Sequence, residues 1–432
     1  MENNAIIVGL DIGTTKIACV VGRRSENGKI EIFGCGTVPS IGVKRGMIAN
    51  IEDTVNSIKE AVLEASEQSN VDIKSVYVGI AGQHIKSFQY YGEVIRENNE
   101  TEITHSEIQK LKEDMKKLGL SPGEEIIDVM PQEYVVDNEH DLKPEGMIGS
   151  KLGAYFHIIT GFAPAIKNVF KCVEKAGLHV DDLILEPVAS SEAVLSDEEK
   201  EAGVVLVDIG GGTTDIAVFH DSIIRHTAVI PFGGNIITED IRQGCNIMKK
   251  HAEEVKVKFG SALVSENSKN DVVSIPGIRG REPREISFYD LAAIIHARLT
   301  EIFDLVKFEI KKSGYENRLG GGMVITGGGA LMKHIDQFAS FKTGLDAKIG
   351  YSNEHLAPET PDELKSPIYA TSIGLVIEGL KRYEEKIRHT SQSGGGKEIN
   401  TGKTEKEPKK KKRSYFNLME IFFGQRNEEL PE

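Results

Sequence analysis

The stretch Gly9-Leu10-Asp11-Ile12-Gly13-Thr14-Thr15-Lys16, near the start of the sequence, decides the fold. Apolar residues precede Asp11 and follow Lys16, so the pattern predicts a strand, a tight glycine turn and a second strand. Glycine and small hydroxyl residues leave backbone N–H groups uncovered, and a phosphate chain can approach them closely. Asp11 can hold a magnesium ion and its waters, while Lys16 adds a positive charge. Taken alone, such a hairpin is more often a simple turn.

The same frame returns as Val205-Leu206-Val207-Asp208-Ile209-Gly210-Gly211-Gly212-Thr213-Thr214-Asp215, with two additional glycines. Asp208 follows Asp11 at about the length of one domain. Two similar domains can therefore each bring a hairpin to one cleft, where the two aspartates face magnesium-bound phosphates. The alternative is that each aspartate only caps its own turn. Asp215 stands where the first copy has Lys16, so the pair is electrostatically unequal.

A third glycine run, Thr326-Gly327-Gly328-Gly329-Ala330, follows an apolar strand, and we expect it to open a helix whose N-terminus suits a nucleotide. The three stretches resemble the phosphate 1, phosphate 2 and adenosine motifs of the actin, Hsp70 and sugar-kinase superfamily. The segments 233–241, 252–256 and 185–190 resemble, more narrowly, the FtsA family of bacterial actin-like division proteins, as does the C-terminal tail. This resemblance covers about residues 5–384 plus that tail.

The resemblance implies an α/β fold of the actin-like, ribonuclease H-like two-domain ATPase type, with a small α+β insertion in the first domain. The expected parts, in chain order, are the first part of subdomain 1A at 1–83, the inserted SHS2-like subdomain 1C at 84–162, the return to 1A at 163–203, the second domain (2A with a small 2B insertion) at 204–384, a disordered linker at 385–408, and a basic block with a membrane-targeting amphipathic helix at 409–432.

Local patterns refine this plan. Thr104 and Glu107 form a capping box that predicts a charged helix in the insertion. Strands are predicted there at 125–131, 133–136 and 155–159. A last helix of the body is predicted from about residue 368 to residue 383, before a stretch that is nearly free of apolar residues.

The resemblance implies ATP and Mg²⁺ as cofactors, with Asp11 and Asp208 at the metal. Glu253 and Lys256 share one face of a helix and would line the ribose and adenine side; the alternative is a surface ion pair of little energetic value. The expected nucleotide-binding residues are Gly13, Thr14, Thr15, Lys16, Gly210, Gly211, Gly212, Thr213, Thr214, Gly233, Gly234, Glu253, Lys256, Gly327, Gly328 and Gly329.

Glu186 is the candidate catalytic residue, because relatives place a polar residue of this segment where a hydrolytic water can be oriented. The alternative is a carboxylate that only supports the metal site. The sequence displays no Ser/His/Asp set and no His/Cys cluster with metal-ligand spacing. We therefore expect at most a weak Mg-dependent ATPase, a nucleotide-gated assembly protein and not a metabolic enzyme.

Composition limits the classes of partner. The chain has 432 residues and a formal net charge of −14, which argues against nucleic acid as the partner of its body. Its four cysteines are far apart, so buried thiols in a reducing compartment are expected in place of disulfides. No long apolar run predicts a membrane span, and no signal peptide is expected, so the chain is predicted to stay in the cytosol.

The tail joins a block of cations to a dense apolar stretch. On a helix, its large apolar residues cover one side, which is typical of an interfacial membrane anchor next to anionic lipid. A partner-binding helix and a nuclear-localisation-like cluster are the alternatives. The residues expected at the membrane are Lys409, Lys410, Lys411, Lys412, Arg413, Tyr415, Phe416, Leu418, Met419, Phe422 and Phe423.

By resemblance, the leading hypothesis is an actin-like protein that forms filaments with itself at the cytoplasmic face of the inner membrane. There, at the division septum, it would anchor the FtsZ ring through the C-terminal peptide of FtsZ and recruit later division proteins. Residues 260–287, with Arg279, Arg281 and Arg284, are the predicted contact for that acidic peptide. The alternatives are a sugar or small-molecule kinase of the same superfamily, an Hsp70-like chaperone and a pilus-assembly relative.

Overall fold

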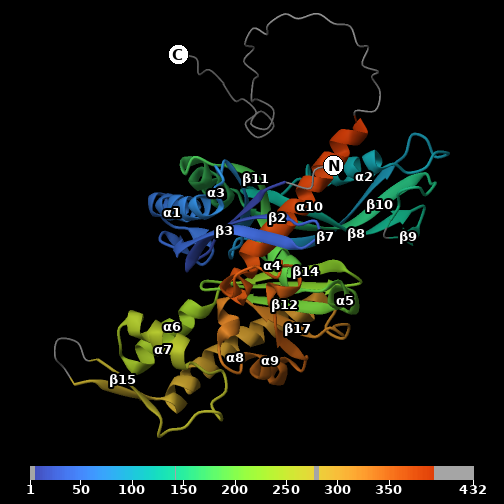
Figure 1. The fold of residues 1–432 in the computed structure, drawn as a ribbon. Helices are drawn as coiled ribbons and strands as arrows, with labels where there is room; N and C mark the ends of the chain where they lie inside the picture. The colour runs from blue at the N-terminus through green and yellow to red at the C-terminus, as the bar shows by residue number, and fades with distance from the viewer. Residues whose placement is uncertain (1–4, 142, 277–281, 394–432) are drawn as a thin grey trace, which may run out of the picture. The chain divides into compact units, whose positions relative to one another are not determined.

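The computed structural model describes residues 5–141, 143–276 and 282–393. A first lobe is built on a five-stranded sheet with the order β11-β6-β1-β2-β3 (Figure 1). The β1–β2 and β2–β3 pairs are antiparallel, and β6 and β11 add parallel strands beside β1. The strands are β1 (Ile7–Ile12), β2 (Lys16–Arg24), β3 (Ile30–Pro39), β6 (Ser75–Ile80) and β11 (His179–Leu185).

A second lobe repeats this topology in the order β14-β13-β12-β17-β18. Again an antiparallel meander of three strands continues into two parallel strands. The two glycine motifs therefore occupy equivalent places, at the tips of the β1–β2 and β12–β13 hairpins. The strands are β12 (Val204–Ile209), β13 (Thr214–His220), β14 (Ile223–Ile230), β17 (Met323–Thr326) and β18 (Ala347–Ile349).

Amphipathic helices cover both sheets. The first of these helices is α1, where the Asn50 side chain accepts hydrogen bonds from two backbone N–H groups and Asn70 ends the helix in a left-handed conformation. Ser287 caps α8, the longest of the described helices, which ends at Gly314 (φ +77°). The helices are α1 (Ile51–Ser69), α3 (Ala163–Lys175), α4 (Glu186–Val194), α5 (Asp197–Ala202), α6 (Gly234–Cys245), α7 (Lys249–Phe259), α8 (Phe288–Ser313), α9 (Ile335–Thr343) and α10 (Ala370–Ser393).

The insertion has its own sheet, β7-β10-β8-β9, with α2 on one face and a separate apolar core. The predicted capping box is confirmed, because Thr104 and Glu107 exchange side-chain and backbone hydrogen bonds. The two strands predicted between 125 and 136 form one strand, β8, and Gln132 bulges out of its ladder between Pro131 and Glu133. The elements are β7 (Lys86–Ile95), α2 (His105–Met115), β8 (Glu124–Val136), β9 (Glu139–Asp141) and β10 (Lys151–Phe162).

Two further differences from the sequence predictions concern helix boundaries. The third glycine run opens only a 3₁₀ turn at Gly328–Leu331, and the next helix, α9, starts at Ile335. The last helix extends to Ser393, into the stretch predicted as linker, because it contains good helix formers and no proline. The remaining elements are the two-residue strands β4 (Val43–Lys44) and β5 (Met47–Ile48), the hairpin β15 (Val272–Ile275) and β16 (Arg284–Ser287), and the 3₁₀ turns η3 (Ser352–Glu354), η4 (Asp362–Lys365) and η5 (Pro367–Tyr369).

Candidate functional site

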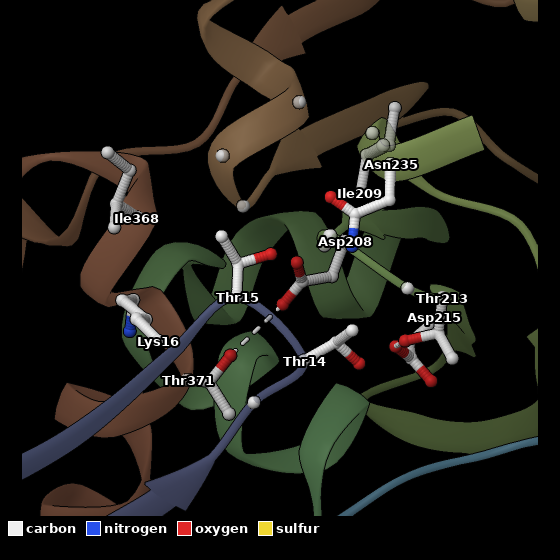
Figure 2. A pocket seen from close by; sticks show the side chains of 18 of the residues that line it. Thr14, Thr15, Lys16, Asp208, Ile209, Thr213, Asp215, Asn235, Ile368 and Thr371 are labelled. Carbon is white, nitrogen blue, oxygen red and sulfur yellow. Dashed lines mark hydrogen bonds between the residues drawn. The ribbon is translucent and has the colours of Figure 1, made fainter. Parts of the chain in front are cut away.

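A cavity of about 320 Å³ lies where the two glycine hairpins meet. Figure 2 shows side chains of both hairpins directed into it. The site is thus assembled from both lobes, as the repeated motif predicts. The predicted residues that line it are Asp11, Gly13, Thr14, Thr15, Lys16, Glu186, Asp208, Gly210, Gly211, Gly212, Thr213, Gly234, Glu253, Lys256, Gly327, Gly328 and Gly329.

Two residues expected at the nucleotide do not line the cavity. The Thr214 hydroxyl is buried and donates to the carbonyl of Phe232 at 2.8 Å, which ties the second hairpin to the loop before α6. Gly233 lies beneath the same hairpin, where a Cβ atom would be 2.5 Å from the Gly210 oxygen. Both residues support the glycine loop from behind.

The hairpin tips touch each other across the site. A Cβ atom added at Gly211 would lie 1.7 Å from Thr15 Oγ1, and one at Gly212 would lie 2.5 Å from Thr14 Oγ1. Such distances are impossible for real atoms, so the contact requires glycine at both positions. Thr14 is held in turn by the backbone N–H of Gly46, which donates to its hydroxyl at 3.0 Å.

The two predicted metal aspartates are both buried, but their charges are balanced differently. The Lys16 ammonium donates to Asp11 Oδ2 at 3.1 Å. Asp208 instead accepts hydrogen bonds on Oδ2 from the Ser190 hydroxyl at 2.7 Å and the Thr371 hydroxyl at 3.2 Å. Burial raises the pKa of Asp208, and the nearby Asp11 raises it further against the lowering effect of the hydroxyls.

Asp215 also lines the cavity, and it was not among the binding residues predicted from the sequence. It pairs directly with Asp208 across the β12–β13 ladder. Burial and the charge of Asp208 raise the pKa of Asp215 to about 8, although the Thr213 hydroxyl donates to its Oδ2 at 2.9 Å. Its Oδ1 is buried without a hydrogen-bond partner among the described residues. The signal was present in the sequence, where Asp215 replaces the lysine of the first copy.

Glu186 begins α4 and lines the cavity beside Gly79, whose missing side chain leaves room for it. Burial raises the pKa of Glu186 well above its ordinary value, and the charges of Asp11, Asp215 and Asp208 raise it further. The arrangement therefore brings the candidate catalytic carboxyl close to the two metal aspartates. A group of raised pKa at this position is suited to accept or hold a proton.

The opposite end of the cavity combines one ion pair with apolar side chains. The Lys256 ammonium donates to Glu253 at 2.8 Å, to the Thr238 hydroxyl at 2.9 Å and to the carbonyl of Gly234 at 3.0 Å. Lys256 is largely buried, so this network is more than a surface pair. The residues that the sequence did not predict at the cavity, besides Asp215, are Ile12, Gly46, Ile209, Asn235, Ile237, Val257, Leu299, Leu331, Met332, Ile368 and Thr371.

The site fits a nucleotide with a magnesium ion. The described residues contain no group of three or more His, Cys, Asp or Glu side chains that could hold a metal ion alone. Mg²⁺ keeps several waters and is usually bound through one or two carboxylates plus substrate phosphates, so Asp11 and Asp208 suffice. The unpartnered Oδ1 of Asp215 offers an acceptor for such a water, and the glycines of both hairpins line the cavity, where phosphate oxygens can approach the backbone. When bound, the ion would neutralise phosphate charge.

Several predicted residues lie outside the described part of the chain. These include the whole basic block and apolar stretch between 409 and 423, as well as Arg279 and Arg281; Arg284 starts β16. Among the helices that the structure describes, none has the length and apolar character needed to cross a membrane.

Comparisons with known proteins point to one family. The family model described as cell division protein FtsA matches residues 205–374, and the SHS2 domain inserted in FtsA matches residues 82–160. The chain is 39% identical to the cell division protein FtsA of Pseudomonas aeruginosa, over 89% of this chain and 92% of that protein. It is 38% identical to FtsA of Neisseria meningitidis, over 90% and 94%.

Solved structures share the fold at lower identity. A PilM–PilN type IV pilus biogenesis complex matches with a TM-score of 0.64 and 18% identity, over 87% of this chain and 98% of that chain. MreB5 of Spiroplasma citri, solved bound to ADP, matches with a TM-score of 0.51 and 17% identity, over 91% and 100%. Together with the inserted domain, these matches confirm the predicted actin-like fold class.

Proposed function

The chain belongs to the FtsA family of cell division proteins, and from this membership we propose that it binds Mg–ATP between its lobes, forms filaments at the cytoplasmic membrane and attaches the FtsZ ring there. The cavity between the hairpins is the observation that carries the nucleotide part of this proposal. In it, Asp11 and Asp208 bind the metal and the glycine tips bind phosphate.

Glu253, Lys256 and the Gly327–Gly329 run form the adenosine end of the proposed site. Apolar side chains such as Val257 and Met332 line this end, so a purine base would be buried there while its ribose contacts the charged pair. Glu186 would orient a hydrolytic water, and its raised pKa supports a role in proton transfer. Turnover would be weak, since assembly and not metabolism is the proposed use of ATP.

The membrane part of the proposal rests on residues 409–423 of the sequence. Each cation near an anionic leaflet contributes about 1 kcal/mol, and the apolar residues add burial at the interface. One such anchor binds reversibly. A filament would present many anchors at once and so convert weak binding into firm attachment.

The proposed FtsZ contact is the segment 260–287, which includes the β15–β16 hairpin. The partner is the acidic C-terminal peptide of FtsZ, and the arginines of this segment would favour its encounter. Relatives of this family at 35–39% identity carry the name cell division protein, whereas the pilus complex shares only the fold at 18% identity. Family membership therefore favours the division role over a pilus-assembly or kinase role.

The membrane attachment is tested by co-sedimentation with anionic liposomes. Phe422→Glu should release the protein into the supernatant, because the substitution places a charge on the apolar side of the tail. Neutralising Lys409 to Lys412 should weaken binding and flatten its dependence on salt.

The matched control is Leu63→Glu, which introduces the same charge at an exposed apolar residue of α1. This control should sediment like the parent, and both variants should keep the parent's affinity for Mg–ATP. A Phe422→Glu protein that still sediments with liposomes would contradict the membrane part of the proposal and leave the nucleotide part standing.

A further inference from the structure

A pair of buried hydroxyls contacts one oxygen of Asp208 from two different helices. Ser190 lies on α4 and is fully buried, and Thr371 lies in the first turn of α10. Both approach Asp208 Oδ2, at 2.7 and 3.2 Å, and their own oxygens are 3.0 Å apart. Figure 2 shows the Thr371 hydroxyl turned toward the aspartate.

The two hydroxyl protons limit how many of these three oxygen–oxygen contacts can be hydrogen bonds. Each hydroxyl has one proton to donate, while the three oxygens form three close contacts. The carboxylate can only accept, so at most two of the three contacts are hydrogen bonds at one time. The 2.7 Å distance assigns the Ser190 proton to Asp208. Thr371 then donates either to Asp208 or to Ser190, and in the second case its dipole strengthens the Ser190 bond.

The other oxygen of the same carboxylate is left open. Among the described residues, Asp208 Oδ1 has no hydrogen-bond donor, and it faces Gly327, where a Cβ atom would be only 2.2 Å away. Gly327 has a φ of +78°, which glycine adopts without strain. The carboxylate is thus held by Oδ2, while Oδ1 lies beside Gly327, and both residues line the cavity.

We propose that Ser190 and Thr371 are positioning residues, which lock the rotamer of Asp208 so that Oδ1 points at the proposed magnesium ion and its waters. This inference rests on the proposed nucleotide site. Hydrogen bonds to a metal-binding carboxylate fix its orientation, and their loss typically lowers metal affinity about 10- to 100-fold. Asp11 of the first hairpin is held differently, by the Lys16 ammonium at 3.1 Å and by a single hydroxyl, that of Ser372, at 3.5 Å.

Calorimetric titration of the full chain with ATP, in Mg²⁺ and in EDTA, tests the inference. Ser190→Ala should weaken ATP binding in Mg²⁺ by about tenfold or more, and leave binding in EDTA within twofold. Thr371→Val should produce a smaller loss, and Thr371→Ser, which keeps the hydroxyl, should restore the parent's affinity. The matched control is Ser191→Ala, because Ser191 is equally buried but donates to the carbonyl of Val188.

Each outcome separates the inference from the proposal beneath it. A parent protein that binds ATP no better in Mg²⁺ than in EDTA overturns the metal part of the proposed function, and the inference with it. If ATP binding by the parent depends on Mg²⁺ and Ser190→Ala has the same affinity as the parent, the inference is overturned and the proposed function stands. An equal loss in EDTA and in Mg²⁺, or an equal loss in Ser191→Ala, would also overturn it, because packing and not the metal would then explain the effect.

Discussion

The two glycine hairpins have nearly the same sequence and different electrostatics. In β1–β2 the ladder ends at the pair of Ile12 with Ile17, so Lys16, the first residue of β2, lies just beyond it and reaches back to Asp11. In β12–β13 the last pair is Ile209 with Thr214, which leaves a turn of the same length, so the two additional glycines shift the following residues along the strand and place Asp215 directly opposite Asp208. One hairpin therefore carries a neutral pair at its tip, and the other carries two acids side by side.

This difference suits the two hairpins to different parts of the proposed ligand, phosphate and metal. Like charges on directly opposed residues destabilise a strand pair, and burial adds to the cost. Such a cost would be offset by a bound cation, so we propose that the second hairpin holds the metal. In the first hairpin, the Lys16 ammonium can attract phosphate, and it neutralises the charge of the Asp11 carboxylate.

The largest effect is expected at Asp208. Asp208→Ala should weaken ATP binding in Mg²⁺ by about a hundredfold, the upper end for lost metal partners. Asp11→Ala should cost no more than about tenfold by the same measure, because the freed Lys16 ammonium can take up phosphate charge. Calorimetry at fixed ATP and varied Mg²⁺ measures both. Asp72→Ala, at an exposed residue of the first lobe, serves as the control. Equal losses of affinity at Asp11 and Asp208 would contradict the assignment of the metal to the second hairpin.

The contact between the tips should be the next most sensitive. Gly211→Ala should lower the free energy of unfolding by about 1–3 kcal/mol, a typical cost of overpacking, because its Cβ atom would overlap Thr15 Oγ1. Gly210→Ala is the matched control, since its nearest neighbour would be 3.4 Å away. Urea unfolding of both variants measures the difference.

A double substitution locates this strain. Adding Thr15→Ala to Gly211→Ala removes the overlapping oxygen and should recover most of the lost stability, which a double-mutant cycle reports as a coupling energy. Independent, additive effects would mean that the tips do not touch in solution.

The pairing of Asp215 with Asp208 should make the nucleotide-free protein less stable as the pH rises toward 8. The folded protein holds a proton on Asp215 up to about pH 8, whereas an unfolded chain releases it near pH 4. The folded state binds more protons between these values, so its free energy of unfolding falls as the pH rises from about 4 to about 8. Asp215→Asn removes this loss and should stabilise the protein by about 1–3 kcal/mol above pH 8.

Urea unfolding at pH 6 and pH 9 checks the direction of this effect. The variant and the parent should differ more at pH 9 than at pH 6. Asp221→Asn, in the exposed turn before β14, should follow the parent at both values. If the free energy of unfolding differed between Asp215→Asn and the parent by the same amount at both pH values, Asp215 would not be the group that holds a proton in the folded protein.

The contrast between the hairpins also explains what the sequence could reveal. Each glycine motif is local, since its strand, turn and charged residue lie within a dozen positions, and it predicted both hairpins and most of the residues at the cavity. The repeat then predicted a two-lobed site. The capping box of the insertion was predictable for the same reason, because its two partners are three residues apart.

Contacts between distant elements were beyond this reasoning. Thr371 reaches Asp208 across 163 positions of sequence, and only the packing of α10 beside α4 brings it there. The bulge at Gln132 joined two predicted strands into one, because its side chain is drawn out of the ladder toward the carbonyl of Ile224 in the second lobe. The end of α10 was missed because the backbone stays helical to Ser393, although Leu380 is the last core residue among the described side chains of this helix.

The smallest effect is expected at Lys16. Its side chain is 21% exposed and pairs with Asp11 at 3.1 Å, so solvent and salt screen its charge. Lys16→Gln should weaken ATP binding by about threefold at low salt, which is less than 1 kcal/mol, and the difference should vanish near 1 M salt. The loss should be the same in Mg²⁺ and in EDTA, because the ammonium attracts phosphate and not the metal.

This equality distinguishes Lys16 from Asp208. Lys86→Gln is the matched control, as Lys86 pairs with Glu124 in the insertion and should not affect ATP binding. If Lys16→Gln lost affinity only in Mg²⁺, the first hairpin would act on the metal as well, since the unpaired Asp11 would then be the group whose geometry had changed. Affinity that depends on Lys16 without the metal, and on Asp208 only with it, would assign phosphate to one hairpin and magnesium to the other.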